Sequence, residues 1–203
     1  MLFDDAYRTV TGNGEGVYSD RGSKFIGYAF PVSTGEEVKI CLADVRQQHP
    51  KARHYCWALR LTPDRSVFRI NDDGEPAGSA ARPMLNVLLS RNLTNVLVVV
   101  VRYFGGTLLG IPGLINAYRS ATEAALDEAG VQEKFSEALY EVLFDYPDMN
   151  AVMQIVKEEA LNVQNKAFDN TCRMRLFIRK SRTEAVLSQL DKIGSLNHKY
   201  ISG

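Results

Sequence analysis

The sequence has few cysteines, no excess of either charge and no long hydrophobic run, and each shortage argues against a class of protein. Cys41, Cys56 and Cys172 show no CxxC spacing and are odd in number, which argues against a disulfide framework or a zinc knuckle. Lysine plus arginine and aspartate plus glutamate both number 24, so no overall field draws the chain to DNA or to an anionic membrane. The longest apolar stretch, Val96 to Val101, is too short to cross a bilayer.

The first ten residues, MLFDDAYRTV, lack the basic leader and the apolar run of a secretion signal. We therefore expect a cytoplasmic protein with reduced thiols. At 203 residues, with 45% hydrophobic and 24% charged residues, the chain has an ordinary globular composition. Its length suits one large domain or two small ones, and neither arrangement requires an oligomer to fold.

Strands and helices with glycine-rich turns are predicted up to Gly130. Tyr7 to Val10 and Phe25 to Phe30 have strand character and flank TGNGEG, whose glycines suit a turn, so a hairpin is expected. Thr34 and Glu37 have the spacing of a capping box, and apolar residues then recur at helical spacing until His49.

Further strands follow this helix. Arg53 to Leu61 alternates, which puts His54 and Cys56 on one face of a strand that pairs with Val67 to Ile70. The β-branched run Val96 to Val101 is typical of a strand covered on both faces. Helices are predicted at 84–90 and 114–129.

After Gly130 the pattern changes to strand, helix, strand, strand, helix, strand, which is the order of a ferredoxin-like split βαβ unit. These elements are expected at 139–144, 151–159, 163–168, 172–178, 183–193 and 196–201. We therefore predict two domains, residues 1–131 and residues 132–203.

A glycine-rich loop lies between the buried strand and the next helix, and its glycines are Gly105, Gly106, Gly110 and Gly113. Exposed backbone N–H groups and the helix dipole favour an anion there, so the loop suits a phosphate. The stretch lacks the GK[ST] ending of a P-loop and the GxGxxG spacing of a dinucleotide site. Tight turns and close helix packing are the alternative explanation.

Asp72, Asp73 and Glu75 bring carboxylates together in an acidic loop next to a run of small residues. These carboxylates suit Mg²⁺, a basic partner or the cap of a helix, and a solvated acidic turn is the simplest reading. His54 and Cys56 are candidates for a general base and a thiolate nucleophile. Alternate residues of a strand lie roughly 6 to 7 Å apart at their backbones, so the close approach that activates a nucleophile would be strained. No cluster has zinc-ligand spacing, and no metal or cofactor is expected.

An arginine strand is predicted in the second domain. Arg173 and Arg175 alternate with apolar residues and face outward, with Phe177 as a stacking ring on the same face. Such a stripe suits RNA phosphates, although a solvated sheet face is the more frequent meaning.

Four segments in the first domain, in the family's order, resemble the Impact/YigZ family. The segments are SKFIGYAFPV, HPKARHYCWA, NDDGEPAGSAARPML and VVVVRYFGGTLLGIPGLINAY. The family usually has a glycine before the proline of the PML turn, where this chain has Arg82.

The resemblance implies an α+β fold in which a first domain like domain 2 of ribosomal protein S5 precedes a small ferredoxin-like domain. Both folds are similar to the last domains of elongation factor G, an analogy that carries no activity by itself. Eukaryotic relatives are translation regulators that compete for the activator of a starvation-sensing kinase. The resemblance carries over Arg53, His54, Asp72, Asp73, Gly74, Glu75, Pro76, Ala77, Gly78, Arg102, Gly105, Gly106, Gly110 and Gly113.

Together these features predict a binding protein that acts in translation control through a protein partner or structured RNA, without turning over a substrate. The role in translation is inferred from the resemblance, whereas the residues themselves indicate only which surfaces could bind a partner. The alternative is a Mg²⁺-dependent enzyme for a phosphorylated or nucleotide substrate, with Asp72 or Asp73 on the metal and the glycine loop on phosphate. No general base stands out, so we expect no catalytic residue.

Overall fold

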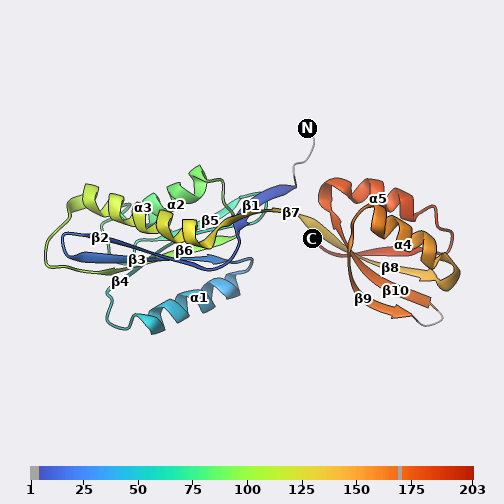
Figure 1. The fold of residues 1–203 in the computed structure, drawn as a ribbon, viewed down its shortest axis with the longest axis horizontal. Coiled ribbons are helices and arrows are strands. Elements are labelled where there is room, and N and C mark those ends of the chain that lie inside the picture. The colour runs from blue at the N-terminus through green and yellow to red at the C-terminus, as the bar shows by residue number, and fades with distance from the viewer. Residues whose placement is uncertain (1–4, 169–170) are drawn as a thin grey trace. The chain divides into compact units, whose positions relative to one another are not determined.

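The computed structural model describes residues 5–168 and 171–203, which divide into two compact units (Figure 1). The larger unit comprises residues 7–134, and the smaller unit combines residues 135–203 with Asp5 and Ala6. Residues 1–4 of the predicted first domain lie outside the described residues.

The larger unit is built on an antiparallel sheet with the strand order β2-β3-β6-β4-β5. β6 lies in the middle, and its residues from Val96 to Val101 are all buried, as predicted for a doubly covered strand. The strands of this sheet are β2 (Gly14–Asp20), β3 (Ser23–Pro31), β4 (His54–Leu61), β5 (Val67–Asn71) and β6 (Val96–Tyr103). A separate pair joins β1 (Ala6–Val10) to β7 (Val131–Phe135).

Helices cover both faces of this sheet (Figure 1). α2 (Ala81–Ser90) and α3 (Gly110–Ala129) pack on one face, around a core that includes Met84, Leu126 and Cys56. α1 (Gly35–Gln48) packs on the other face. Within the described part of the chain, no helix is long and apolar enough to span a membrane.

The predicted capping box at the start of α1 is confirmed. Thr34 Oγ1 accepts a hydrogen bond from the Glu37 N–H over 3.2 Å, and a Glu37 carboxylate oxygen accepts one from the Thr34 N–H. The helix ends at Gln48, and His49 is its C-cap residue. The two reciprocal bonds satisfy N–H groups that a helix otherwise leaves without a partner in its first turn.

The predicted hairpin across TGNGEG is wrong. Gly14 and Gly16 lie within β2, which pairs with β3 through a turn at Arg21 and Gly22, whereas β1 pairs with β7. The glycines serve packing here, because a Cβ atom at either position would overlap the backbone of α3 at Ala125. The absence of a side chain at these two positions of the edge strand lets α3 approach the sheet directly.

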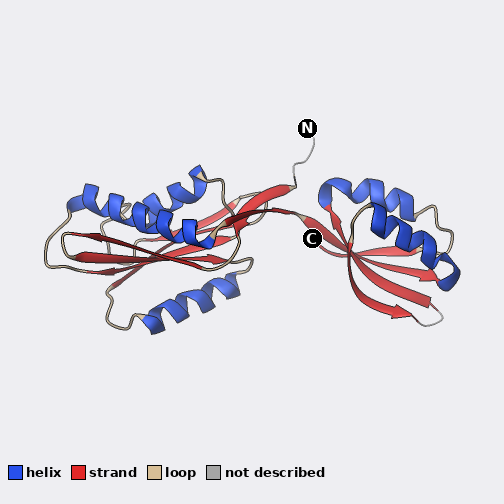
Figure 2. Ribbon diagram, in the orientation of Figure 1, coloured by secondary structure: helices blue, strands red, loops and turns tan. Residues whose placement is uncertain are grey.

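The smaller unit has the predicted order of strands and helices and an antiparallel sheet with the order β11-β8-β10-β9. α4 and α5 cover one face of this sheet (Figure 2). Cys172, Met174, Leu176 and Ile178 of β10 point toward these helices and are fully buried, which confirms the predicted alternation. The elements are β8 (Glu137–Asp145), α4 (Met149–Glu158), β9 (Asn162–Phe168), β10 (Thr171–Arg179), α5 (Thr183–Leu190) and β11 (Asn197–Ser202), with 3₁₀ turns at Tyr146–Asp148 and Lys180–Arg182.

A buried carboxylate ties the segment before β1 into the smaller unit. Asp5 is 5% exposed and accepts hydrogen bonds from the Ser181 N–H over 3.0 Å and from Ser181 Oγ over 2.6 Å. Arg179 Nη2 donates to the same side chain over 3.3 Å. Burial raises the pKa of Asp5, but these hydrogen bonds outweigh it and hold the pKa below its ordinary value.

Candidate functional site

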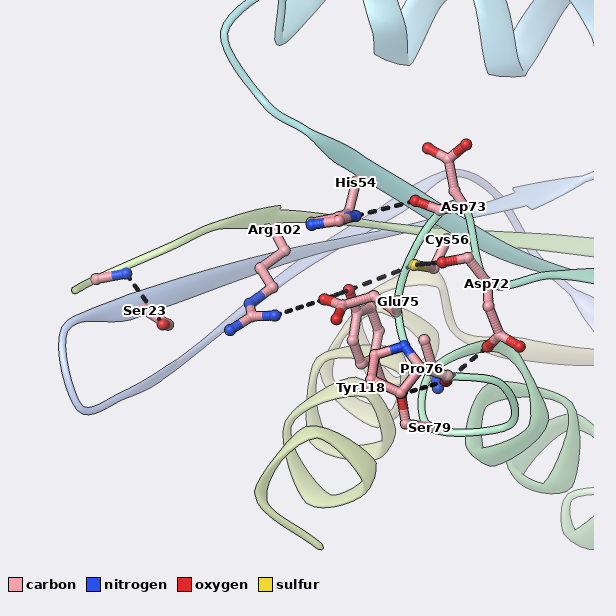
Figure 3. A network of polar contacts seen from close by, with 12 residues as sticks. Ser23, His54, Cys56, Asp72, Asp73, Glu75, Pro76, Ser79, Arg102 and Tyr118 are labelled. Atoms are coloured by element: carbon pink, nitrogen blue, oxygen red, sulfur yellow. Dashed lines mark hydrogen bonds and ion pairs between the residues drawn. The ribbon is translucent and has the colours of Figure 1, made fainter. Parts of the chain in front are cut away.

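Arg102 at the end of β6 forms a buried ion pair with the acidic loop. Its Nη1 donates to Glu75 Oε1 over 2.7 Å, and the Tyr118 hydroxyl of α3 donates to the same oxygen over 2.8 Å (Figure 3). The Arg102 and Glu75 side chains are only 8% and 4% exposed. Among the three acids of the loop, Glu75 is therefore the ion-pair partner of Arg102.

Asp72 caps the start of α2. One of its carboxylate oxygens accepts from the Gly78 N–H over 2.9 Å, and the other accepts from the N–H groups of Ala80 and Ala81. Among the roles predicted for these acids, the helix cap is therefore the one that Asp72 performs. N–H donors occupy both of its oxygens.

Asp73 also binds backbone. Its Oδ2 accepts from the Tyr55 N–H of β4 over 2.8 Å, and the Arg46 guanidinium of α1 lies 3.7 Å from Oδ1. All the carboxylates of the acidic loop thus fix the loop to neighbouring elements. Because donors already hold them, their arrangement suits a rigid surface better than a magnesium site.

His54 and Cys56 lie on one face of β4, as predicted, but they do not bind each other. His54 Nδ1 donates to the Asp73 carbonyl over 2.9 Å, and Cys56 Sγ donates to the Asp72 carbonyl at the same distance (Figure 3). Burial raises the pKa of the Cys56 thiol to about 12. A neutral, buried thiol is a poor nucleophile, so the side chain supports the loop instead.

The glycine turn, residues 104–113, comprises the connection from β6 to α3 and the first turn of α3. The Gly105 N–H donates to Ser23 Oγ over 3.1 Å, and a Cβ atom at Gly105 would overlap the backbone of Gly22. Gly106 has a φ of 89°, a conformation that favours glycine. Gly110 and Gly113 lie in the first turn of α3. Close approach of the turns at residues 22 and 105 is thus one reason for this glycine pattern.

Apolar side chains of the glycine turn face solvent. Phe104 is 57% exposed, Leu108 81% and Ile111 56%. The Arg102 guanidinium carbon lies 5.7 Å from the centroid of the Phe104 ring and 5.5 Å from that of Phe25. The glycines stand out in this stretch of the sequence, whereas the exposed apolar residues were not predicted as site residues, although apolar residues in a loop without periodicity were a usable signal.

The remaining predicted site residues are Arg53 and three residues of the smaller unit. Arg53 is exposed just before β4. In the smaller unit, Arg173 is exposed, Arg175 lies 3.5 Å from Glu141 of β8, and Phe177 is half-buried. The predicted outward face of the arginine strand is confirmed, and a carboxylate already offsets one of its charges.

Comparison with known proteins gives the family. Residues 21–126, about half of the chain, match the family model of the Impact N-terminal domain. The chain belongs to the Impact family. An Impact family member of Haemophilus influenzae is 34% identical over 175 residues and covers 85% of each chain. YigZ of Escherichia coli, another member, is 33% identical over 151 residues, which cover 72% of this chain and 74% of YigZ.

A crystal structure of a hypothetical protein is similar to this chain over nearly its whole length. It matches with a TM-score of 0.72 at 27% identity and covers 98% of both chains. The matched Impact segment contains the acidic loop, Arg102 and the glycine turn, and it ends before the smaller unit. The family resemblance seen in the sequence is confirmed.

Proposed function

We propose that this Impact family member is a non-catalytic, cytoplasmic regulator of translation that binds a protein partner through the glycine turn. The observation that carries the proposal is the exposure of Phe104, Leu108 and Ile111 on a backbone that the buried Arg102–Glu75 pair holds in place. Grouped apolar side chains on a soluble surface are typical of protein interfaces, and aromatic side chains supply much of the binding energy there.

The translation part of the proposal rests on the family, because the resemblance implies that eukaryotic members regulate translation. The contacts of the acidic loop support binding over catalysis. Asp72, Asp73 and Glu75 accept N–H or O–H hydrogen bonds, and Cys56 is buried with a raised pKa. A magnesium-dependent reaction would need these carboxylates to bind the metal in addition to the donors that already hold them.

An affinity purification from the source cell tests the proposal. The full chain and a Leu108→Asp variant carry the same tag, and bound proteins are identified by mass spectrometry. We expect translation factors or ribosomal proteins with the unmodified chain and their loss with the variant, since a charge in the centre of an apolar contact must be desolvated. Phe68→Asp on β5 is the matched control, because Phe68 is 54% exposed far from the turn in sequence.

A turnover assay covers the enzymatic alternative. The full chain is incubated with nucleotides and Mg²⁺, and product release is followed. Turnover that Asp72→Asn abolishes would overturn the proposal, as would captured proteins that are unrelated to translation or unaffected by Leu108→Asp.

We also propose the finer fold and the domain division. The strand order β11-β8-β10-β9 supports a ferredoxin-like fold for the smaller unit, and the larger unit is proposed to share the fold of ribosomal protein S5 domain 2. Residues 1–131 and 132–203 are expected to fold separately, each with a cooperative thermal transition. Insoluble or molten fragments would contradict this division.

A further inference from the structure

Helices α2 and α3 enclose a groove on the surface of the larger unit, with a volume of about 390 Å³. Its lining follows one side of each helix. Residues spaced i, i+4 and i+8 stack along a helix, so the groove extends over about 12 Å. The polar and charged lining residues used below are Arg82, Asn86 and Ser90 of α2 and Arg119 and Glu123 of α3.

The helices run in the same direction, which orders the charges along the groove. Arg91, just after α2, is bonded to Asp127 near the end of α3. Counting back nine residues from each side of this bond, at an equal rise per residue, brings Arg82 level with Tyr118, next to Arg119. Arg119 and Glu123 lie one helical turn apart on α3, so the guanidinium groups and the Glu123 carboxylate are separated by about 6 Å along the groove.

The groove arginines have no ion-pair partner among the described residues. Arg82 and Arg119 are exposed, and neither makes an ion pair or a side-chain hydrogen bond among residues 5–168 and 171–203. Arg82 lies in the first turn of α2, where the helix dipole disfavours a cation. Asp72, the acid bonded to that turn, has both oxygens occupied by backbone N–H groups. A ligand that supplies carboxylates would meet an unsatisfied positive charge here.

We propose that this groove binds an acidic segment of a protein partner, with carboxylates on Arg82 and Arg119 and apolar side chains against Val87 and Ile115. An extended segment of about four residues spans the groove at 3.3 Å per residue. The proposal rests on the proposed function and names the chemistry of the partner. Exposed Ile111 lies one helical turn before Ile115, so the groove continues the surface of the glycine turn.

The lining favours a peptide over RNA. Single-stranded RNA is bound along a continuously positive track with stacking rings, whereas this groove has an apolar base and the Glu123 carboxylate toward one end. An acidic peptide with interspersed apolar residues satisfies both the guanidinium groups and the apolar base.

The test uses a fluorescein-labelled hexapeptide of alternating Glu and Leu, its Gln and Leu counterpart, and the full chain, in fluorescence anisotropy. We expect the acidic peptide to bind about tenfold more tightly at low salt and to lose this advantage as salt rises, because the charges are exposed. Arg82→Gln and Arg119→Gln should each weaken acidic peptide binding about threefold, and the double variant should bind both peptides equally.

Arg69→Gln is the matched control, since Arg69 is exposed on β5 and lies on the α1 face of the sheet, opposite to the groove. A charge-reversed variant, Arg82→Glu with Arg119→Glu, should prefer a Lys and Leu hexapeptide. Unchanged melting temperatures show that the variants fold, as expected for exposed arginines without partners.

Equal binding of the two peptides, or equal binding by the double variant and the unmodified chain, would overturn the inference. So would oligouridine that binds more tightly than the acidic peptide and depends on the same arginines. If one of these outcomes arises while Leu108→Asp still abolishes the capture of translation proteins, the groove is not the binding site and the proposed function stands. Peptide binding as expected, together with captured proteins that Leu108→Asp does not change, would reject the proposed function and support the groove as a peptide site.

Discussion

The guanidinium of Arg102 and the carboxylate of Glu75 form a buried ion pair of 2.7 Å at which β6, the acidic loop and α3 meet. A charge left without its partner in such a place must be desolvated without compensation. The pair therefore makes the glycine turn and the acidic loop depend on each other for their positions.

Arg102→Ala is expected to lower the free energy of unfolding by about 3 to 5 kcal/mol, because it leaves Glu75 buried and unpaired. Replacing both residues, as Arg102→Met with Glu75→Leu, should cost less than Arg102→Ala alone. Urea denaturation of the variants measures the difference. Arg53→Ala, at an exposed position, should stay within about 0.5 kcal/mol of the unmodified chain.

Cys56 should be inert in the folded protein, since burial raises the pKa of its thiol to about 12 and leaves the side chain without exposed surface. Ellman's reagent at pH 8 should react with half-buried Cys41, although burial also raises the pKa of that thiol, and spare Cys56 and buried Cys172. All these thiols should react after unfolding in guanidinium chloride. Rapid labelling of Cys56 in the native chain would contradict the buried arrangement.

Asp5 should make the smaller unit sensitive to acid. Its folded pKa lies below the unfolded value of 3.8, so its stabilising contribution is present above about pH 4 and is lost as the pH falls through the folded pKa. Asp5→Asn is expected to cost about 2 kcal/mol at pH 7 and progressively less below pH 4. Hydrogen exchange of peptides that contain Ser181 measures the effect, and Asp145→Asn, at an exposed position, should leave it unchanged.

The arginine strand of the smaller unit is expected to supply any affinity of this protein for RNA. Replacing Arg173 and Arg175 by Ala should flatten the plot of log K against log salt by roughly 1.4 to 1.8, at about 0.7 to 0.9 per phosphate contact. Because Glu141 lies 3.5 Å from Arg175, Arg173→Ala alone should have the larger effect of the single variants. Lys157→Ala, on the helical side, is the control, and an equal slope in the double variant would exclude this face.

Local patterns were enough to predict the elements that leave a signature within the same stretch of chain. The Thr34 capping box is formed by residues three positions apart, and the alternation along β4 and β10 marks which side of each strand faces the core. The structure agrees with both. The hairpin predicted across TGNGEG is wrong because Gly14 and Gly16 are needed for close packing against α3, which lies more than a hundred residues later in the chain. The sequence alone does not distinguish a glycine that is needed for a turn from a glycine that allows a helix to pack closely on a strand.

The candidate site was predictable in composition but not in pairing. The acidic loop and Arg102 stand out by residue type, yet only the fold shows that Glu75 takes the ion pair while Asp72 takes the helix cap. The exposed side chains of Phe104 and Leu108 were missed because exposure depends on where α3 begins relative to the sheet.

The contact between the backbones at Gly22 and Gly105 has a consequence for the rate and strength of association. A turn held by a neighbouring turn, by Ser23 and by the buried Arg102 has little conformational freedom left to lose when a partner arrives. The entropy lost in ordering the interface is then lost during folding and not on binding. A preorganised surface of this kind needs no slow rearrangement after encounter, so a small apolar area can suffice for selective, rapidly reversible recognition.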